Sequence, residues 1–527
     1  MAWSNEFLAA ISDREVRLAY RLETIHDPGG TSNSSTWRSF TGTEERAQIS
    51  RVGGFSGSVT PGSWSSTQGA WSVEIAGSMQ GELVNLLRGS LGILYAGRPE
   101  WDASQYQPIA IGILHNIKGR PPRWALEFWG IFAGLQSRRT TSPGVPPSTP
   151  AQFELFYDVG TTTTIDVLYT AADTDLDVTD ETIFELETSG TGLVKVTPNT
   201  GDDAFYLTYT GTSSGQLTGV ATTAALGTVA VDAPINSVVT HCAYLDGHPV
   251  DILRRILAST GAGTNGTWDD YPASWGFGIA DDYFAHGEIA AWRDAVIVND
   301  AGGTYNWTLV VEAPVGNGIG WLTNIMAEAG IWPVVRQGLI SVRAAQDPDD
   351  SGLAPLGAMV SGIHIQDDDI IEILSWEAFD SSQSAVAGTC AVSPNAALTD
   401  ANATERFTVA GVHSMPAIEE VEHDLTEALL GSGAAQTANA DGDRIRLQKY
   451  DIYTREKLSL RCRPRLRQLV EGDLVDLTTS RIYGRFESTE AGYSRRRALV
   501  LSNSQSWGRA YCDITLAITP TWDEDIS

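Results

Sequence analysis

The sequence predicts a multidomain protein of mainly β structure with short helices, a β-rich α+β class. Its 527 residues exceed what a single hydrophobic core usually serves, so the chain should divide into three or four domains. Hydrophobic residues make up 42% and charged residues 19%, a balance typical of folded chains and not of disordered ones. Segments in which every second side chain is apolar, the pattern of half-buried strands, outnumber segments with helical periodicity.

An N-terminal β-domain is predicted over residues 1–140. Residues 16–22, 71–75 and 124–128 alternate between apolar and polar side chains, as half-buried strands do. A short helix is expected over 80–88. Residues 141–150 are rich in proline and can form neither a helix nor an interior strand, so they are interpreted as a linker.

An acidic inserted β-domain is predicted over residues 151–245. Residues 151–232 hold thirteen acidic side chains and one basic side chain, which gives a net charge of 1 − 13 = −12. Residues 207–220, followed by 224–230, are expected to form two strands joined by a turn rich in Gly and Ser.

A middle α+β domain is predicted over residues 246–370. Its helices are expected over 249–257 and 321–329. The first helix has a proline in its first turn, where the missing N–H does no harm, and the second is followed by a glycine, a common stop signal.

The remaining residues, 371–527, are predicted to form a C-terminal β-domain with one long helix over 416–430. Residues 444–511 hold fifteen basic and seven acidic side chains, a net charge of 15 − 7 = +8, which predicts a basic face. Such a reversal of sign relative to the acidic domain usually reflects surfaces that meet different partners. The strands of this domain are expected over 458–465, 493–501 and 511–518.

The whole chain is acidic, with 35 basic and 65 acidic residues and a formal net charge of −30. A surface with this charge binds duplex DNA and anionic lipid poorly, because affinity for phosphates comes mainly from Lys and Arg. The first residues lack the basic and apolar regions of a signal peptide, and no apolar run approaches ~20 residues. Insertion of this chain into a membrane is therefore not expected.

No motif predicts a catalytic residue, a cofactor or a bound metal, and we expect that the chain is not an enzyme. The GxGxxG match at 261–266 follows a predicted helix instead of a strand, so it is interpreted as a turn. Residues 173–180 space their aspartates like a calcium loop, but Val178 and Phe184 replace its Gly and its final Glu, which favours a solvated turn. The four cysteines lie too far apart to predict a disulfide framework. Weaker metal candidates are the aspartates 367–369, His241 and His248 beside Cys242, and an ExxH at 420–423.

Short motifs in several segments resemble those of one protein family. They comprise a YTG…LTGV hairpin, the helix at 249–257, a helix followed by a hairpin over 318–344, and a GD turn that leads into the last strands. In this order they resemble the tail-tip or baseplate hub proteins of bacteriophages and gene transfer agents. The chain departs from the family pattern at Ala221, where these proteins often have arginine. The motif residues are Tyr209, Gly211, Leu217, Gly219, Gly472 and Asp473.

The resemblance implies a structural role in a virion, at the distal end of the tail, for a protein made in the host cytoplasm. It implies tube-like β-barrel or sandwich domains and a homotrimeric ring. Its partners would be the distal tail or tube protein, the tape-measure protein, and fibre or tip proteins. DNA would pass through the lumen without specific binding, and an acidic wall suits this because it repels phosphate. The basic face, with Arg495, Arg496 and Arg497, is expected to meet a neighbouring ring.

Two other classes fit parts of the sequence. A carbohydrate-binding, receptor-recognising adhesin of the tail would also be acidic, rich in tryptophan and rich in β structure. A tail glycosidase that degrades the cell wall would need two carboxylates ~5–10 Å apart, and among 65 acidic residues no pair stands out. Neither class accounts for the order of the matching segments.

Overall fold

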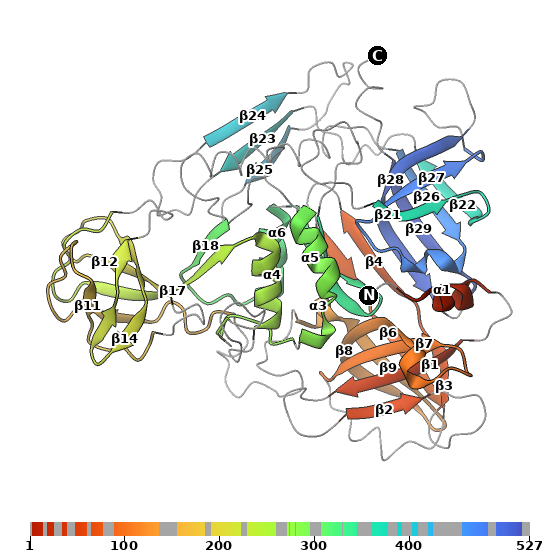
Figure 1. Ribbon diagram of the computed structural model, residues 1–527, viewed down its shortest axis with the longest axis horizontal. Coiled ribbons are helices and arrows are strands. Elements are labelled where there is room, and N and C mark those ends of the chain that lie inside the picture. Colours follow the sequence, from red (N-terminus) through yellow and green to blue (C-terminus); the bar gives the residue numbers. More distant parts are fainter. Residues whose placement is uncertain are drawn as a thin grey trace.

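The fold is mainly β, as predicted, with several sheets and a few short helices. The structure is a computed structural model (Figure 1), and the residues that it describes fall into ranges separated by gaps. These ranges are 3–13, 18–25, 34–38, 48–60, 65–76, 89–135, 155–184, 191–222, 229–259, 271–272, 274–279, 281–295, 307–328, 330–344, 360–377, 387–392, 403–408, 420–424, 456–482, 492–507 and 509–518. Across these ranges, no helix has both the length and the apolar character needed to cross a membrane.

The N-terminal region forms a seven-stranded antiparallel sheet in the order β2-β1-β7-β8-β9-β6-β3. In β6, Trp71, Val73 and Ile75 face the core while the intervening side chains are only partly buried, which is the predicted alternation. Helix α1 (Asn5–Ser12) packs its buried face on the same core. The strands are β1 (Ala19–Ile25), β2 (Ser34–Arg38), β3 (Gln48–Val52), β6 (Trp71–Ala76), β7 (Leu91–Gly97), β8 (Gln107–Arg120) and β9 (Arg123–Gly130), with the 3₁₀ turn η1 (Ala103–Gln105) before β8.

The predicted strands at 71–75 and 124–128 are confirmed as β6 and β9. The predicted strand at 16–22 corresponds to β1, which begins at Ala19 and continues to Ile25. The predicted helix at 80–88 and the linker at 141–150 lie outside the described residues.

The C-terminal region forms a sheet in the order β21-β27-β28-β29-β26-β22, and two strands from the N-terminal region join it. Strand β4 pairs with β28 and β5 pairs with β4, so residues 55–60 and 65–68 belong to a sheet built mostly from residues beyond 360. The strands are β21 (Val360–Ile365), β22 (Ile370–Glu377), β26 (Glu456–Cys462), β27 (Leu474–Thr479), β28 (Tyr493–Ser506) and β29 (Tyr511–Ile518), joined by β4 (Phe55–Thr60), β5 (Ser65–Gln68) and the 3₁₀ turn η6 (Pro464–Gln468). The strands predicted over 493–501 and 511–518 are confirmed in β28 and β29. The strand predicted over 458–465 is confirmed as β26, but it ends at Cys462, before the 3₁₀ turn η6.

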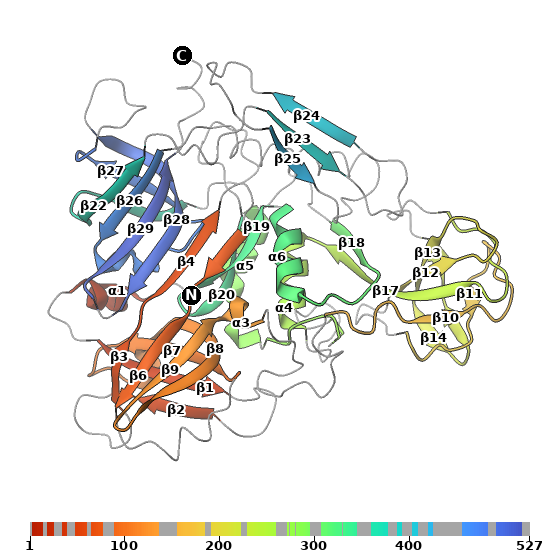
Figure 2. The ribbon, with the colours of Figure 1, turned by 180° about the vertical axis from the view of Figure 1, so that it is seen from behind.

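Helices and a hairpin lie beside these two sheets, on the side toward the acidic domain (Figure 2). The predicted helices are confirmed as α4 (Pro249–Ala258) and α6 (Gly318–Glu328), and the hairpin after α6 is β19 (Ile331–Arg336) and β20 (Leu339–Ala344). Their buried side chains form one core with residues from both sheets, including Ile111 and Leu499. The other elements here are α3 (Ile131–Leu135), η4 (Asp281–Tyr283), α5 (His286–Ala295) and β18 (Trp307–Val311).

The acidic domain, residues 155–245, projects at one end of the molecule (Figure 1). Its larger sheet runs β10-β17-β12-β13-β16, and a smaller sheet runs β11-β15-β14. Strand β17 extends out of this domain, and its second half pairs with β18. The strands are β10 (Thr162–Thr164), β11 (Asp175–Asp177), β12 (Gly192–Thr197), β13 (Phe205–Tyr209), β14 (Gly211–Ser213), β15 (Gln216–Thr218), β16 (Ala221–Thr222) and β17 (Val238–Gly247).

One element of the prediction is wrong. The long helix expected over 416–430 is interrupted by strand β25 (Glu420–Asp424), which pairs in parallel with β23 (Ala387–Val392) beside β24 (Ala403–Thr408). Val421 is the single apolar residue of the segment Glu-Val-Glu-His-Asp, so its own sequence does not indicate a strand, and pairing with β23 overrides helix propensity. The rest of 416–430 lies outside the described residues.

Candidate assembly surfaces and a buried junction

The GD motif lies at a buried junction between the C-terminal sheet and the β19–β20 hairpin. Asp473 accepts a hydrogen bond from Nε of Arg343 at 2.9 Å, and its other oxygen accepts one from the backbone N–H of Val470 at 3.0 Å. The side chain of Arg343 is fully buried and that of Asp473 is 5% exposed. The motif therefore ties two regions that lie about 130 residues apart in the sequence.

Arg343 is the centre of a wider ion network. Its Nη1 lies 2.6 Å from a carboxylate oxygen of Glu288 on α5, and Arg336 reaches the same oxygen at 2.9 Å. Burial alone would raise the pKa of Glu288, but the two arginines outweigh burial and lower that pKa. Burial alone would lower the pKa of Arg343, and Asp473 and Glu288 reverse this effect. Glu288 and Arg343 are therefore charged at neutral pH and pair with each other inside the protein.

The backbone conformation and the close packing at position 472 both require glycine. Its φ angle is +91°, a region that side chains disfavour, and a Cβ atom there would lie 2.5 Å from the ring of Trp332. The close approach lets the turn pack directly on the β19–β20 hairpin. The predicted family motif is thus a packing feature of the junction.

The motif residues of the acidic domain are also structural. Tyr209 and Leu217 are fully buried in that domain's core. Gly219 has φ +65°, and a Cβ atom there would lie 2.2 Å from Oγ1 of Thr210. Gly211 begins β14, which pairs with β15 through the turn at Gly215. The hairpin predicted within 207–220 is confirmed as β14–β15, while β13 pairs with β16. Of the segment 224–230 that was expected to follow it, residues 224–228 lie outside the described residues, and residues 229 and 230 are not in a strand.

The three arginines expected at an assembly interface occupy different environments on β28. Arg495 is exposed and has φ +52°. Arg496 is only 8% exposed, and Arg497 is partly buried with its Nε 4.0 Å from Asp476. Arg495 is the member of the trio that is free to meet a partner surface.

Exposed apolar side chains gather in two places within the part of the chain that the structure describes. The acidic-domain patch lies on residues 165–171 and 229–238, which run side by side through a Tyr169–Ala233 bridge. The β22 patch lies on the edge strand of the C-terminal sheet, which pairs with β26 on one side only among the described strands. The acidic-domain patch consists of Val167, Leu168, Val229, Val231, Ile235 and Val238, and the β22 patch of Ile371, Leu374 and Trp376.

Two irregularities in β22 explain why apolar side chains face outward there. The register with β26 shifts between Ile370 and Glu372 and again between Ile373 and Ser375. Ile371 and Leu374 are the extra residues at these bulges, so their side chains leave the core face. Sequence reasoning missed this surface, because the bulges break the two-residue period by which a strand is recognised.

The residues weighed as metal ligands have other roles. His241 is fully buried with its Nδ1 3.9 Å from Asp158, and burial lowers its pKa. Nδ1 of His248 caps α4 by accepting the N–H of Val250 at 3.2 Å. Asp173 caps its own turn through the N–H of Thr170. The described residues contain no group of three His, Cys, Asp or Glu side chains placed to hold a metal ion.

The other candidate motifs lie beside the C-terminal sheet, on strand β25 and outside the described residues. Asp367 and Asp369 pair with Arg481 and Arg465. The ExxH at 420–423 lies on strand β25 and not on a helix. The GxGxxG match at 261–266 lies outside the described residues.

No protein-family model matches the chain, and no curated protein matches it. Among solved structures it is similar to the 43 kDa tail protein of prophage MuSo2 from Shewanella oneidensis, with 9% identity and a TM-score of 0.35 over 96% of this chain and 100% of that one. It is similar to the prophage tail protein gp18 from Listeria monocytogenes EGD-e, with 9% identity and a TM-score of 0.33 over 95% and 94% of the two chains. A chain of a native gene transfer agent virion matches with 13% identity and a TM-score of 0.20, over 45% of this chain and 84% of that one. At these values we base neither fold nor function on the likeness.

Proposed function

We propose that the protein is a structural component of a phage tail, and not an enzyme. The observation that carries this proposal is the distribution of exposed apolar side chains: all nine large ones among the described residues fall in the acidic-domain patch and the β22 patch. Contiguous exposed apolar surface is typical of sites that bind other proteins. The two patches lie toward opposite ends of the long axis (Figure 1), which suits a subunit that is held between neighbours.

The motif order of the sequence supports a more specific role within the tail. We propose that the chain is a hub at the tail tip or baseplate, where copies form a homotrimeric ring that closes or extends the tube. The ring would anchor the distal tail or tube protein, the tape-measure protein and fibre or tip proteins, and it would let DNA pass. The described part of the acidic domain suits a surface near DNA, because Lys195 is its single Lys or Arg and is bound to Glu312.

The test of this role is the assembly state of the purified chain, measured by light scattering and negative-stain imaging at high concentration. The expected result is a threefold ring with a central channel. Replacing Leu168 and Ile235 by Asp, or Ile371 and Leu374 by Asp, should disrupt ring formation and leave the secondary structure intact. The matched control is the pair Thr212→Asp and Ser214→Asp, which adds the same two charges at exposed sites of the acidic domain outside the patch.

Two results would contradict the proposal. A monomer at every concentration would count against the ring. Rings that form equally well with both pairs of Asp substitutions would show that the patches are not the contact surfaces. Release of reducing sugar from purified cell walls would instead favour the glycosidase class.

A further inference from the structure

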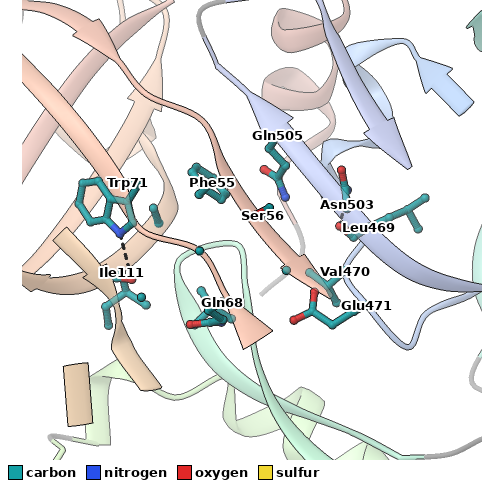
Figure 3. A pocket seen from close by; sticks show the side chains of 15 residues that line it. Phe55, Ser56, Gln68, Trp71, Ile111, Leu469, Val470, Glu471, Asn503 and Gln505 are labelled. Atoms are coloured by element: carbon teal, nitrogen blue, oxygen red, sulfur yellow. Dashed lines mark hydrogen bonds between the residues drawn. The ribbon is translucent and has the colours of Figure 1, made fainter. Parts of the chain in front are cut away.

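Glu471 is a buried carboxyl group where three parts of the chain meet. Its side chain borders a small cavity, about 40 Å³, between the β4–β5 hairpin, the N-terminal sheet and the C-terminal sheet (Figure 3). The residue is 4% exposed. The hairpin contributes Phe55, Ser56, Gly57, Gln68 and Gly69 to the cavity, so it forms one of its walls.

The contact between Glu471 and the hairpin is close. A Cβ atom built on Gly57 would lie 2.3 Å from a carboxylate oxygen of Glu471, so a larger residue at position 57 would displace the carboxyl group from this contact. Gly57 is also paired with Asn503 in the β4–β28 ladder. The carboxyl group therefore lies against the backbone through which the hairpin joins the C-terminal sheet.

Two side-chain acceptors that line the cavity lack hydrogen-bond partners among the described residues. They are Oδ1 of Asn503 and Oε1 of Gln505, and both are buried. Glu471 adds two further oxygens, and no other residue of the cavity wall is titratable or charged. A proton on Glu471 would convert one acceptor into a donor, whereas a carboxylate would add negative charge among unsatisfied oxygens.

We propose that protonated Glu471 latches the β4–β5 hairpin onto the C-terminal sheet and that loss of this proton loosens the hairpin. The latch is a property of the folded chain and does not depend on the proposed role in a phage tail.

The electrostatics of the site agree with this arrangement. Burial raises the pKa of Glu471 from 4.5 to about 7, against the opposing effects of its own backbone N–H and of Arg343, and Asp473 raises it further. The pKa of Glu471 is raised in the latched state. Below about pH 4.5 the side chain is therefore protonated whether the hairpin is latched or loosened, and the latched state loses no stability there. Between about 4.5 and 7 the stability of the latched state falls as pH rises, and above that range the loss is complete. The titration window therefore lies close to neutral pH.

The experiment is hydrogen exchange of the full-length protein at pH 5.5 and 8.5, corrected for intrinsic exchange and read at the amides of Ser56, Gly57 and Ser58. Amides of β12 in the acidic domain serve as the internal reference. In the wild type, protection of the hairpin relative to β12 should fall at least tenfold between the two pH values. In Glu471→Gln, which mimics the protonated side chain, the change should be less than threefold.

The matched control is Glu127→Gln, because Glu127 bonds Lys118 and Asn116 and its lowered pKa keeps it charged throughout this pH range. The control should keep the full pH response of the wild type. Protection that does not depend on pH in the wild type, or a pH response that persists in Glu471→Gln, would overturn the latch. Failure of Glu471→Gln to fold would also overturn it, since the neutral side chain is the form proposed to hold the hairpin. Restoration of protection at pH 8.5 by 5 mM Ca²⁺ would overturn it in favour of a cation site.

Discussion

The buried junction and the acidic domain handle charge in opposite ways. At the junction the guanidinium of Arg343 is buried between Asp473 and Glu288, and Glu288 also pairs with Arg336. In the described part of the acidic domain, ten carboxylates oppose one lysine, and most of these carboxylates are exposed. Charged side chains thus form buried ion pairs at the junction, whereas in the acidic domain they make the surface negative.

The two regions also differ in how they are assembled from the sequence. The junction joins the β4–β5 hairpin, the β19–β20 hairpin and the C-terminal sheet, which are separated by hundreds of residues. The main core of the acidic domain comes only from residues 165–239. The comparison indicates an integrated body to which a self-contained domain is attached.

Strand β17 is the connection between these regions. Its first half pairs with β10 and β12 in the acidic domain, and its second half pairs with β18 next to the central core. Glu312, just after β18, binds both Lys195 and the hydroxyl of Tyr206 across this connection. Burial is the largest cause that raises the pKa of Tyr206, and Glu312 adds to it. The domain is therefore held by a shared strand and a side-chain cluster at its base.

Among substitutions at the junction, Arg343→Ala is expected to cause the largest loss in the free energy of unfolding. Removing this guanidinium leaves Asp473 without its buried cation and Glu288 with one arginine fewer. Breaking a buried ion pair in this way costs about 3–5 kcal/mol. The free energy of unfolding, measured by denaturant titration of the whole chain, should fall by that amount.

The control for this prediction is Arg293→Ala. Arg293 also pairs with an aspartate, Asp251 at 2.6 Å, but its side chain is 45% exposed. An exposed pair of this kind contributes less than about 1 kcal/mol. Equal losses in the two variants would show that the junction is not the stabilising centre that its geometry indicates.

A second prediction compares two glycines with almost the same backbone conformation. Gly472 has φ +91° and a crowded Cβ position, whereas Gly201 in the acidic domain has φ +92° and nothing within 4 Å of that position. Gly201→Ala should cost about 1 kcal/mol from backbone strain alone. Gly472→Ala adds the clash with Trp332 and should cost about 3 kcal/mol in total. Thermal unfolding of the two variants measures the difference, and similar costs would contradict the close packing at the junction.

Local patterns predicted much of the fold because the information lies within a few residues. Alternation predicted β6, β9 and the strands β26, β28 and β29, a proline indicated the start of α4, and a glycine indicated the end of α6. The partner of Arg343 could not be predicted. A single arginine in an alternating segment is typical of a surface position, and Asp473, the residue that allows its burial, lies 130 residues away in the sequence. The same holds for the pairing of β4 with β28, and for Glu471, whose environment is built by three separate regions.

The smallest expected effect on stability concerns Arg495, and it distinguishes surface charge from buried charge on a single strand. Arg495→Glu should change the free energy of unfolding by less than about 0.5 kcal/mol, because the side chain is exposed and any non-glycine residue there shares the strain of φ +52°. Arg496→Glu, at the next position, places a carboxylate at a site that is 8% exposed and should destabilise by several times that amount. If the basic face meets a neighbouring ring, Arg495→Glu should weaken that assembly while the isolated chain keeps its stability. Equal stability losses in the two variants would mean that Arg495 is also part of the folded interior, and the proposed contact surface would have to lie elsewhere.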